Sequence, residues 1–399
     1  RGGHPTGADF HQKGGAHPSA SLVRPIAAMS LGVLTATFLA TLPLGTPAAV
    51  LGQEARGGWM GAKFGALRTR TLMEITLPGS HNSGSYQGAL SAERPCVSDY
   101  GYYRGYRAAA LAAGKEPLTQ EGFDERMVRW NVNHFTPISE QLRRDGARFF
   151  HLKICNFGKP GAERMDLSSV HFQHRGYTTK ETVKSTLEDL KAFLAEYPRE
   201  VVVLGFGNLH NSAPGGFGDA DVLALSSALR AFLGPALLVG REELFNSTLG
   251  ELISAGKRVV VFMGGSYSVA GSLPPGVIPS SEALAEHWDD IMASGDLERS
   301  REWLVKDVHE QATRRDRYSV MQANPNNDEE LMYEAMISGK GPQSNEAFLD
   351  SFLRGLPSLV SGAVASAPGA RINAVNSDFL NISQTFEIAM KLMGPEVMM

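Results

Sequence analysis

Leu77-Pro78-Gly79-Ser80-His81-Asn82-Ser83 is the stretch from which the fold is best inferred. It follows an apolar run at 72–77 that is typical of a buried strand, and its Pro-Gly pair predicts a sharp turn. The turn brings a histidine and an amide to the end of the strand. A strand that ends in this way can hold an imidazole at the mouth of a barrel. By itself the pattern is weak evidence for catalysis.

Similar apolar runs recur after residue 65, and amphipathic, helix-like stretches separate most of them. The runs lie at 72–77, 147–154, 168–173, 201–206, 236–239, 258–263, 317–322 and 371–376. In the helix-like stretch 179–197, one face carries Val183, Leu187, Leu190, Phe193 and Leu194. Eight strands that alternate with helices predict an α/β fold, an irregular (β/α)8 TIM-type barrel over residues 65–395.

Composition limits the classes of function. The chain has 399 residues, 43% hydrophobic and 20% charged, which is enough to bury a large core. A formal net charge of −4 argues against nucleic-acid binding but allows one small cationic pocket. The two cysteines, Cys96 and Cys155, are too few for a zinc site. They would form one bridge if the chain is secreted, and otherwise Cys155 is a small buried residue of a strand.

The first 52 residues are expected to lie outside the barrel. Residues 1–20 are rich in Gly, His, Pro and Ser, which predicts disorder. Arg24 then precedes an apolar run at 26–42, and small residues follow at 46–49. These are the parts of a secretory signal peptide, although a run of this length also suits an uncleaved signal anchor. We therefore expect a secreted or extracytoplasmic protein, either free or membrane-anchored by this segment.

An insertion at about 86–130 interrupts the alternation of strands and helices. Its tyrosines stand among Gly, Arg and Ala, at Tyr86, Tyr100, Tyr102, Tyr103 and Tyr106. Aromatic rings beside Arg104 and Arg107 suit the headgroup level of a membrane, so transient contact with a membrane surface is one interpretation. The alternative is an ordinary insertion that packs over the barrel or is partly disordered, and the charged residues Glu93, Arg94 and Asp99 argue against membrane contact.

The strand predicted at 147–154 carries two cationic candidates. Side chains alternate across a strand, so His151 and Lys153 share one face while Leu152 and Ile154 take the other. A buried lysine needs a partner or an anionic ligand. A surface edge with a lysine that reaches into solvent is the alternative interpretation.

Two later segments end in polar groups. Val170-His171-Phe172-Gln173-His174-Arg175-Gly176 places His174 beside a glycine turn at the barrel mouth, whereas His171 suits a satisfied core histidine. The last predicted strand closes with Asp378. Because the last strand of a closed barrel neighbours the first, Asp378 would meet His81. The alternative is a helix cap or turn residue.

Together these segments resemble the X-domain of phosphatidylinositol-specific phospholipase C, in particular its metal-independent bacterial-type and X-domain-only members. The resemblance rests on the order LPGSHNS (77–83), QLRRDGARFFHLK (141–153), His-x-Gly (174–176), Pro-x-Glu-Val-Val-Val (198–203) and Asn-Ser-Asp-Phe-Leu (376–380). It covers residues 70–210 well and residues 310–390 loosely.

The resemblance implies a two-histidine phosphoryl transfer. In the family, one histidine deprotonates the inositol hydroxyl next to the phosphodiester, and the second protonates the departing diacylglycerol oxygen, which leaves a cyclic inositol phosphate. Here His81 would be the base and His174 the acid, since imidazole titrates near neutral pH. Asp378 would orient His81, and Lys153 falls where the family has an arginine that stabilises the phosphorane.

The chain also departs from the family pattern. Lys153 stands in place of the family's arginine, and a lysine lacks the planar guanidinium that can bind two phosphate oxygens at once. His151 and Asn82 replace acidic residues of the bacterial-type members, and both are taken as substrate-binding. Calcium-dependent relatives also have His-Asn at the positions of His81 and Asn82. They need carboxylates at the positions that His151, Lys153 and Gly207 occupy in this chain, and none of these three residues is acidic. Because calcium takes several oxygen ligands, we expect neither a metal nor another cofactor.

Three functions remain open. The first is a metal-independent phosphodiesterase or lyase acting on phosphatidylinositol-type phospholipids, and the second is a related glycerophosphodiesterase-like enzyme. The third is a catalytically impaired barrel that only binds a phosphate headgroup. The expected partner is a phospholipid or other phosphodiester, with no nucleic acid, and the expected state is a monomer.

Overall fold

The structure, a computed structural model, describes residues 53–96, 101–214, 216–265, 268–286, 295–311 and 316–398. The signal peptide, anchor and disorder predicted for residues 1–52 therefore lie outside the described residues. Within the described ranges, no helix combines the length and the apolar character needed to cross a membrane.

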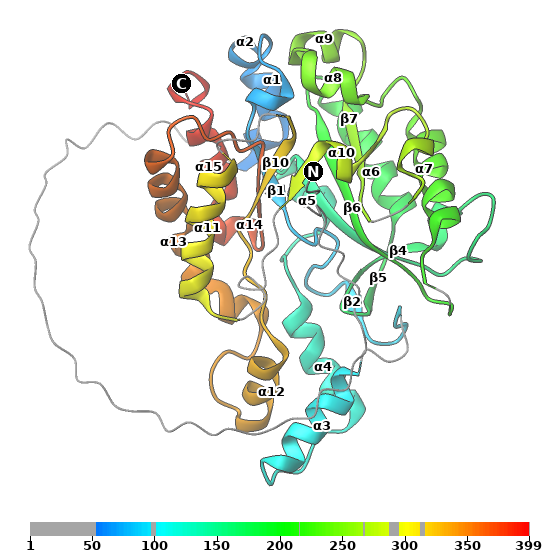
Figure 1. Cartoon of the computed structure of the whole chain (residues 1–399), viewed down its shortest axis with the longest axis vertical. Coiled ribbons are helices and arrows are strands. Elements are labelled where there is room, and N and C mark those ends of the chain that lie inside the picture. The colour runs from blue at the N-terminus through cyan, green and yellow to red at the C-terminus, as the bar shows by residue number, and fades with distance from the viewer. Residues whose placement is uncertain are drawn as a thin grey trace, which may run out of the picture. The chain divides into compact units, whose positions relative to one another are not determined.

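Parallel strands form a distorted barrel, which confirms the predicted fold class (Figure 1). In chain order they are β1 (Leu77–Ser80), β3 (Phe149–Asn156), β6 (Val202–Asn211), β7 (Val259–Met263), β8 (Val277–Pro279), β9 (Leu284–Glu286), β10 (Tyr318–Gln322) and β11 (Ala374–Ser377). The first strand pairs with the last, so that Leu77 lies opposite Ala374 and Ser80 opposite Ser377. No ladder joins β8 to β9 within the described residues, and the barrel is open there.

Two of the eight runs predicted as barrel strands do not form strands of the barrel. The run at 168–173 forms β4 (Val170–His174), which pairs antiparallel with β3 and with β5 (Tyr177–Thr182), while β2 (Leu90–Ser91) extends this sheet. A two-residue connection can join only antiparallel strands, which is why β4 and β5 leave the barrel. The run at 236–239 contributes a single bridge, from Leu238 to Val259. The barrel instead uses β8 and β9, three residues each, which are too short to show an apolar period.

Helices and short 3-10 turns connect the strands. The turns are η1 (Gln53–Gly58), η2 (Leu72–Glu74), η3 (Leu167–Ser169) and η4 (Ala270–Ser272). The helices are α1 (Trp59–Ala62), α2 (Phe64–Leu67), α3 (Tyr102–Ala112), α4 (Gln120–Asn131), α5 (Ile138–Arg143), α6 (Val183–Glu196), α7 (Asp219–Leu233), α8 (Arg241–Asn246), α9 (Leu249–Ser254), α10 (Ser280–Ala283), α11 (Leu297–Gln311), α12 (Glu329–Ser338), α13 (Asn345–Ser366), α14 (Leu380–Ser383), α15 (Thr385–Leu392) and α16 (Pro395–Met398). Helix α6 confirms the helix predicted within 179–197, and its five predicted apolar residues are buried.

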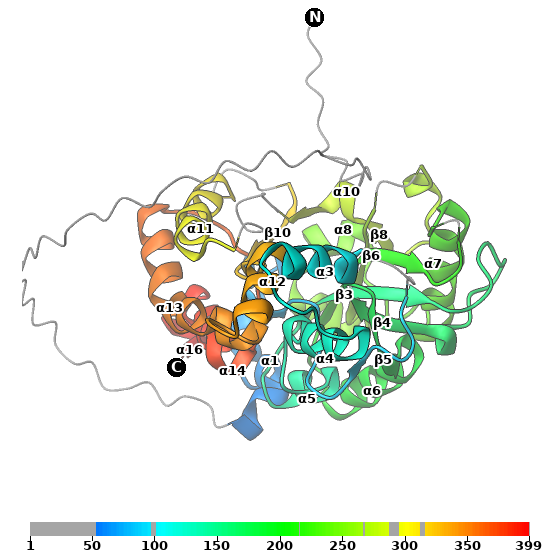
Figure 2. The same cartoon turned by 90° about the horizontal axis from the view of Figure 1, so that it is seen from below.

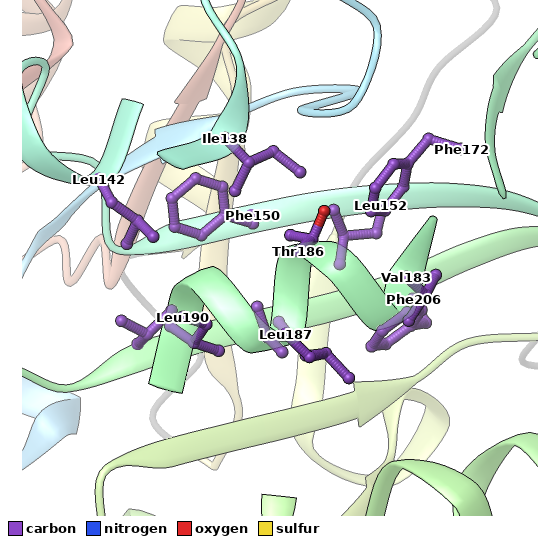
Figure 3. Close-up of a pocket in the computed structure, with 12 residues that line it drawn as sticks. Ile138, Leu142, Phe150, Leu152, Phe172, Val183, Thr186, Leu187, Leu190 and Phe206 are labelled. Carbon is purple, nitrogen blue, oxygen red and sulfur yellow. The ribbon is translucent and has the colours of Figure 1, made fainter. Parts of the chain in front are cut away.

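The two faces of the barrel strands belong to different cores. Leu152 and Ile154 of β3 pack outward with α6, whereas Phe149 packs inside the barrel against residues of β1, β6 and β7. On the outer side, a narrow apolar gap of about 10 Å³ remains between α5, α6 and the strands (Figure 3). Leu152 lines this gap, so the gap lies on the face of β3 opposite to His151 and Lys153. It is therefore a packing defect of the core and no part of the candidate site.

The insertion after β1 folds into α3 and α4, which lie beside α12 (Figures 1 and 2). The rings of Tyr103 and Tyr106 stack on each other with centroids 6.4 Å apart, whereas Tyr100 lies outside the described residues. Tyr106 is buried, with its ring 5.0 Å from Phe123 and 6.0 Å from Tyr333. The interpretation that the insertion packs against the rest of the protein therefore holds for Tyr106. Membrane contact by this segment stays a prediction.

One disulfide ties the insertion to the barrel. Cys96, which follows β2, bonds Cys155 near the end of β3. Both cysteines are buried, and the backbone N–H of Cys96 donates to the carbonyl of Gly176 at 2.8 Å. The bridge therefore fixes this segment against the turn between β4 and β5. Disulfides persist mainly in oxidising compartments, which agrees with an extracytoplasmic location.

Candidate active site

His81 stands at the carboxyl end of β1, next to the end of β11. Gly79 lets the two strands approach closely, since a Cβ at this position would lie 2.8 Å from the carbonyl oxygen of Val375. The N–H of His81 then donates to the carbonyl of Ser377 at 3.0 Å. This register brings Asp378, the next residue of the last strand, beside His81.

His81 and Asp378 form a buried pair. The Nδ1 of His81 lies 2.8 Å from Oδ1 of Asp378, which confirms the predicted meeting of the first and last strands. Burial, followed by the charges of Lys153 and His134, holds the pKa of His81 well below its usual range. Burial raises the pKa of Asp378 to about 6, against the opposing effects of His134 and neighbouring amides. At neutral pH the pair is thus a neutral imidazole whose Nδ1–H donates to a carboxylate.

A buried network supports the loop that carries His81. Nε2 of His134 donates to the carbonyl of His81 at 2.7 Å and lies 3.0 Å from Oγ of Ser80. Ser80 donates to Oε1 of Gln141, whose amide nitrogen donates to the carbonyl of Ser83. The loop therefore owes its position to side chains from the end of the insertion and from α5.

His174 ends β4 beside the two-residue turn. Its Nδ1 donates to the carbonyl of Asn131 at 2.9 Å, which leaves Nε2 as the acceptor for the amide of Asn82 at 3.2 Å. Because Asn82 directly follows His81, one short segment holds both imidazoles close together. The Oδ1 of Asn82 is buried without a hydrogen-bond partner among the described residues. A rotation of this amide would therefore present an acceptor to a protonated Nε2.

The electrostatics of His174 do not favour its charged form. Its side chain is 6% exposed. Burial, then the charges of Lys153 and Arg175, hold its pKa well below the usual range, against a hydrogen bond to Asn131. A general acid must carry a proton, so His174 needs an anion in the site to become one.

His151 and Lys153 project from β3 on the inner face, as the alternation predicted. The ring of His151 stacks on that of His81, with centroids 5.2 Å apart and planes 7° apart. Lys153 is partly exposed, and burial together with the charge of Arg175 lowers the pKa of its ammonium to about 8. The charge of Lys153 also lowers the pKa of His81, His151 and His174, which places it within electrostatic reach of all three rings.

All six predicted residues therefore gather at one end of the barrel: His81, Asn82, His151, Lys153, His174 and Asp378. Their chemical roles stay predictions. His171, expected to be a satisfied histidine, has its Nδ1 2.9 Å from the carbonyl of Thr179 and lies outside this group.

Three further residues of the site escaped the sequence analysis. Arg175 follows His174 directly, and His134 precedes the strand predicted at 147–154, but nothing in the spacing of either residue indicated a role in the site. Glu286 ends the short strand β9, and Gln322 donates to it at 3.2 Å. Burial raises the pKa of Glu286 to about 7, against the charge of Lys153. Glu286 thus lies within electrostatic reach of Lys153, as Asp378 does.

No cluster of three or more His, Cys, Asp or Glu side chains that could hold a metal ion occurs among the described residues. The expected absence of calcium stays a prediction.

Comparisons with known proteins confirm the resemblance to the phosphatidylinositol-specific phospholipase C (PI-PLC) X-domain proteins. PI-PLC X domain-containing protein 1 of Homo sapiens is 28% identical over 221 residues, which cover 55% of this chain and 59% of that protein. PI-PLC X domain-containing protein 2 of Mus musculus is 26% identical over 174 residues, or 44% and 45% of the two chains. The chain therefore matches about half the length of these relatives. No family model matches the chain.

Solved structures share the fold. A variant of phosphatidylinositol-specific phospholipase C from Staphylococcus aureus covers 85% of this chain with 98% of its own, at 16% identity and a TM-score of 0.51. Another structure of the S. aureus protein gives 15% identity, the same coverage and a TM-score of 0.50. The chain therefore has a phospholipase C-like phosphodiesterase fold.

Proposed function

We propose that this protein is a phosphodiesterase that cleaves phosphatidylinositol-type phospholipids by general acid-base catalysis with two histidines. The observation that carries the proposal is the contact of a neutral His81 with Asp378, with His174 held nearby by Asn82. A base must be unprotonated before it acts, and the low pKa of His81 meets this condition.

In the proposed reaction, Nε2 of His81 removes the proton of the inositol hydroxyl next to the phosphodiester. The resulting oxygen attacks phosphorus, and the bond from phosphorus to the lipid oxygen breaks. His174 protonates that leaving oxygen, so the products are diacylglycerol and a cyclic inositol phosphate. Asp378 stabilises the charged form of His81, and Lys153 stabilises the negative charge on phosphorus.

The test is incubation of the full chain with phosphatidylinositol vesicles in the presence of a chelator. We expect a cyclic inositol phosphate, detected by phosphorus NMR, and loss of product with His81→Ala or His174→Ala. His171→Ala is the matched control, because His171 lies on the same strand as His174 but outside the site. Turnover that survives in either variant would reject the assigned roles. Activity that depends on added metal would favour a glycerophosphodiesterase-like enzyme.

A catalytically impaired headgroup-binding barrel is the second candidate. It is favoured by the neutral amide of Asn82, which contacts His174 where a carboxylate would stabilise the imidazolium. This candidate predicts that inositol phosphates bind without any product being formed.

A further inference from the structure

Arg175 follows His174 in an unusual backbone conformation. Arg175 and Gly176 connect β4 to β5, and both have positive φ, at 46° and 86°. A two-residue hairpin turn with two positive φ values favours Asn-Gly or Gly-Gly, because an arginine there strains its backbone. Strain of this kind persists where the surrounding structure holds the residue for another reason.

The guanidinium of Arg175 meets only uncharged partners among the described residues. Its Nη1 donates to Oδ1 of Asn327 and lies 3.2 Å from Sδ of Met332, and its Nη2 donates to the carbonyl of Asn327 at 2.8 Å. An arginine has five N–H groups, so these contacts leave two for a ligand. No carboxylate lies within ion-pair distance of it in the described part of the chain, although Asp328 and Glu329 act on it from farther away.

Asn327 connects Arg175 to the catalytic pair. The amide nitrogen of Asn327 donates to Oδ1 of Asn345 at 2.9 Å, and Asn345 in turn reaches Oδ2 of Asp378 at 3.5 Å. The position of Arg175 is therefore coupled, through two buried amides, to the residue that orients His81.

Arg175 also lies within electrostatic reach of Lys153, the other cation of the site. Its charge lowers the pKa of both Lys153 and His174. Two neighbouring cations repel each other when nothing lies between them, and an anion that contacts both relieves the repulsion. The charges of Asp378 and Glu286 partly offset this repulsion at Lys153, and a bound anion that contacts both cations would stabilise the arrangement further.

We propose that Arg175 is a second cationic ligand of the phosphate, acting with Lys153 on the phosphodiester group of the substrate. Arg175 supplies from the hairpin turn the N–H donors that a lysine at position 153 lacks. This inference rests on the proposed function, since it assigns a ligand of the same site. Its chemical requirement is an anionic phosphate, and inorganic phosphate serves as the probe.

The decisive variant is Arg175→Asn. It creates the Asn-Gly sequence that this turn prefers, so the hairpin is retained while the charge is removed. The matched control is Arg126→Gln, because Nη1 of Arg126 donates to the carbonyl of Met336 in α12, as Arg175 donates to the carbonyl of Asn327 just before α12, but it does so from outside the site. Arg175→Lys keeps the positive charge but lacks the planar guanidinium. This variant tests the inference if Arg175→Asn does not fold.

Two readouts are needed on the full chain. The first is the histidine ring NMR titration with and without phosphate, which reports the pKa of His174 in the absence of turnover. The second is kcat/KM for phosphatidylinositol. In Arg175→Asn we expect phosphate affinity and kcat/KM to fall by about 10- to 100-fold, as for a lost charge-assisted hydrogen bond, and the pKa of His174 in the empty site to rise. Arg126→Gln should match the wild type in both.

Unchanged phosphate affinity and kcat/KM in Arg175→Asn would overturn the inference. An equal loss in Arg126→Gln would also overturn it, because the effect would then come from α12. If the wild type binds phosphate in an Arg175-dependent way but never cleaves the lipid, the proposed function fails and the phosphate site stands.

Discussion

At the scale of single residues, the pKa shifts of the two histidines suit a base at His81 but not an acid at His174. His81 is neutral and contacts a carboxylate, as a base requires, whereas burial, followed by the charges of Lys153 and Arg175, holds the pKa of His174 low. A bound phosphodiester adds a negative charge beside these cations and thereby raises the pKa of His174. The bound substrate would thus favour the protonated form of His174, the form that a general acid needs. Anion binding would then be a condition of turnover.

The first prediction concerns Asp378→Asn. The substitution removes the charge that stabilises the protonated form of His81 but keeps a side chain of similar size. We expect kcat to fall by about 10²-fold, less than the fall of about 10⁴-fold for His81→Ala, since the base itself is retained. Steady-state kinetics on phosphatidylinositol measures both, and a wild-type kcat in Asp378→Asn would exclude the orienting role.

The pH profile of kcat/KM should be bell-shaped. Activity falls as pH drops below about 6, because Asp378, with a pKa of about 6, takes up a proton and loses its charge. It falls again as pH rises above about 8, because Lys153, with a pKa of about 8, loses its proton and its positive charge. Lys153→Arg should remove the alkaline limb, since arginine does not titrate there. An alkaline limb that stays near 8 in this variant would assign it to another group.

At the scale of elements, the β4–β5 hairpin carries the second half of the site outside the barrel. Its position depends on the disulfide and on hydrogen bonds from the segment that ends at Cys96, including the bond of Cys96 N–H to Gly176. The same hairpin turn carries His174 and Arg175. Loss of the bridge should therefore affect both the stability of the fold and the position of His174.

The disulfide prediction uses the double variant Cys96→Ala/Cys155→Ala. The bridge closes a loop with a sequence separation of 59 residues. Such a loop contributes about 4 kcal/mol in the chain-entropy model, and measured values are often smaller. We expect the guanidinium unfolding midpoint to fall, and the wild type reduced with a dithiol to match the variant. Equal midpoints for the oxidised, reduced and mutated proteins would show that the bridge adds no stability.

At the scale of the whole molecule, the opposite end of the barrel is held by a buried ion pair. Arg148, before β3, and Glu200, before β6, have no exposed side-chain surface and lie 2.7 Å apart. Glu200 also accepts from the backbone N–H of Gly61 at 2.8 Å, so the pair joins the start of two strands to the N-terminal helices. We expect this end to contribute stability, and the candidate site lies at the other end.

Glu200→Gln should therefore destabilise the fold without changing the chemistry. Removing one partner leaves a buried, uncompensated guanidinium, which costs about 3–5 kcal/mol. Chemical denaturation measures the loss, and kcat at low temperature should remain that of the wild type. The double variant Arg148→Met/Glu200→Leu should recover part of the stability. A single variant as stable as the wild type would contradict a structural role for the pair.

Much of the site follows from local rules that the sequence obeys. The alternation of a strand predicted that His151 and Lys153 share a face, and the neighbourhood of first and last strands predicted the contact of His81 with Asp378. These rules hold because they depend only on the order of the strands and on the alternation of successive side chains between the two faces of a strand. They do not need the exact path of any loop.

The sequence by itself determined the class of barrel and the residues at the ends of β1, β3 and β11, since apolar periodicity and strand order are local properties. Only the tertiary structure decided that β4 and β5 form an antiparallel hairpin, and that β8 and β9 complete the barrel. It alone brought Arg175 to Asn327, 152 residues away, and His134 behind His81. Contacts across such separations depend on how loops pack and where buried polar groups find partners, and no short-range pattern in a chain records that.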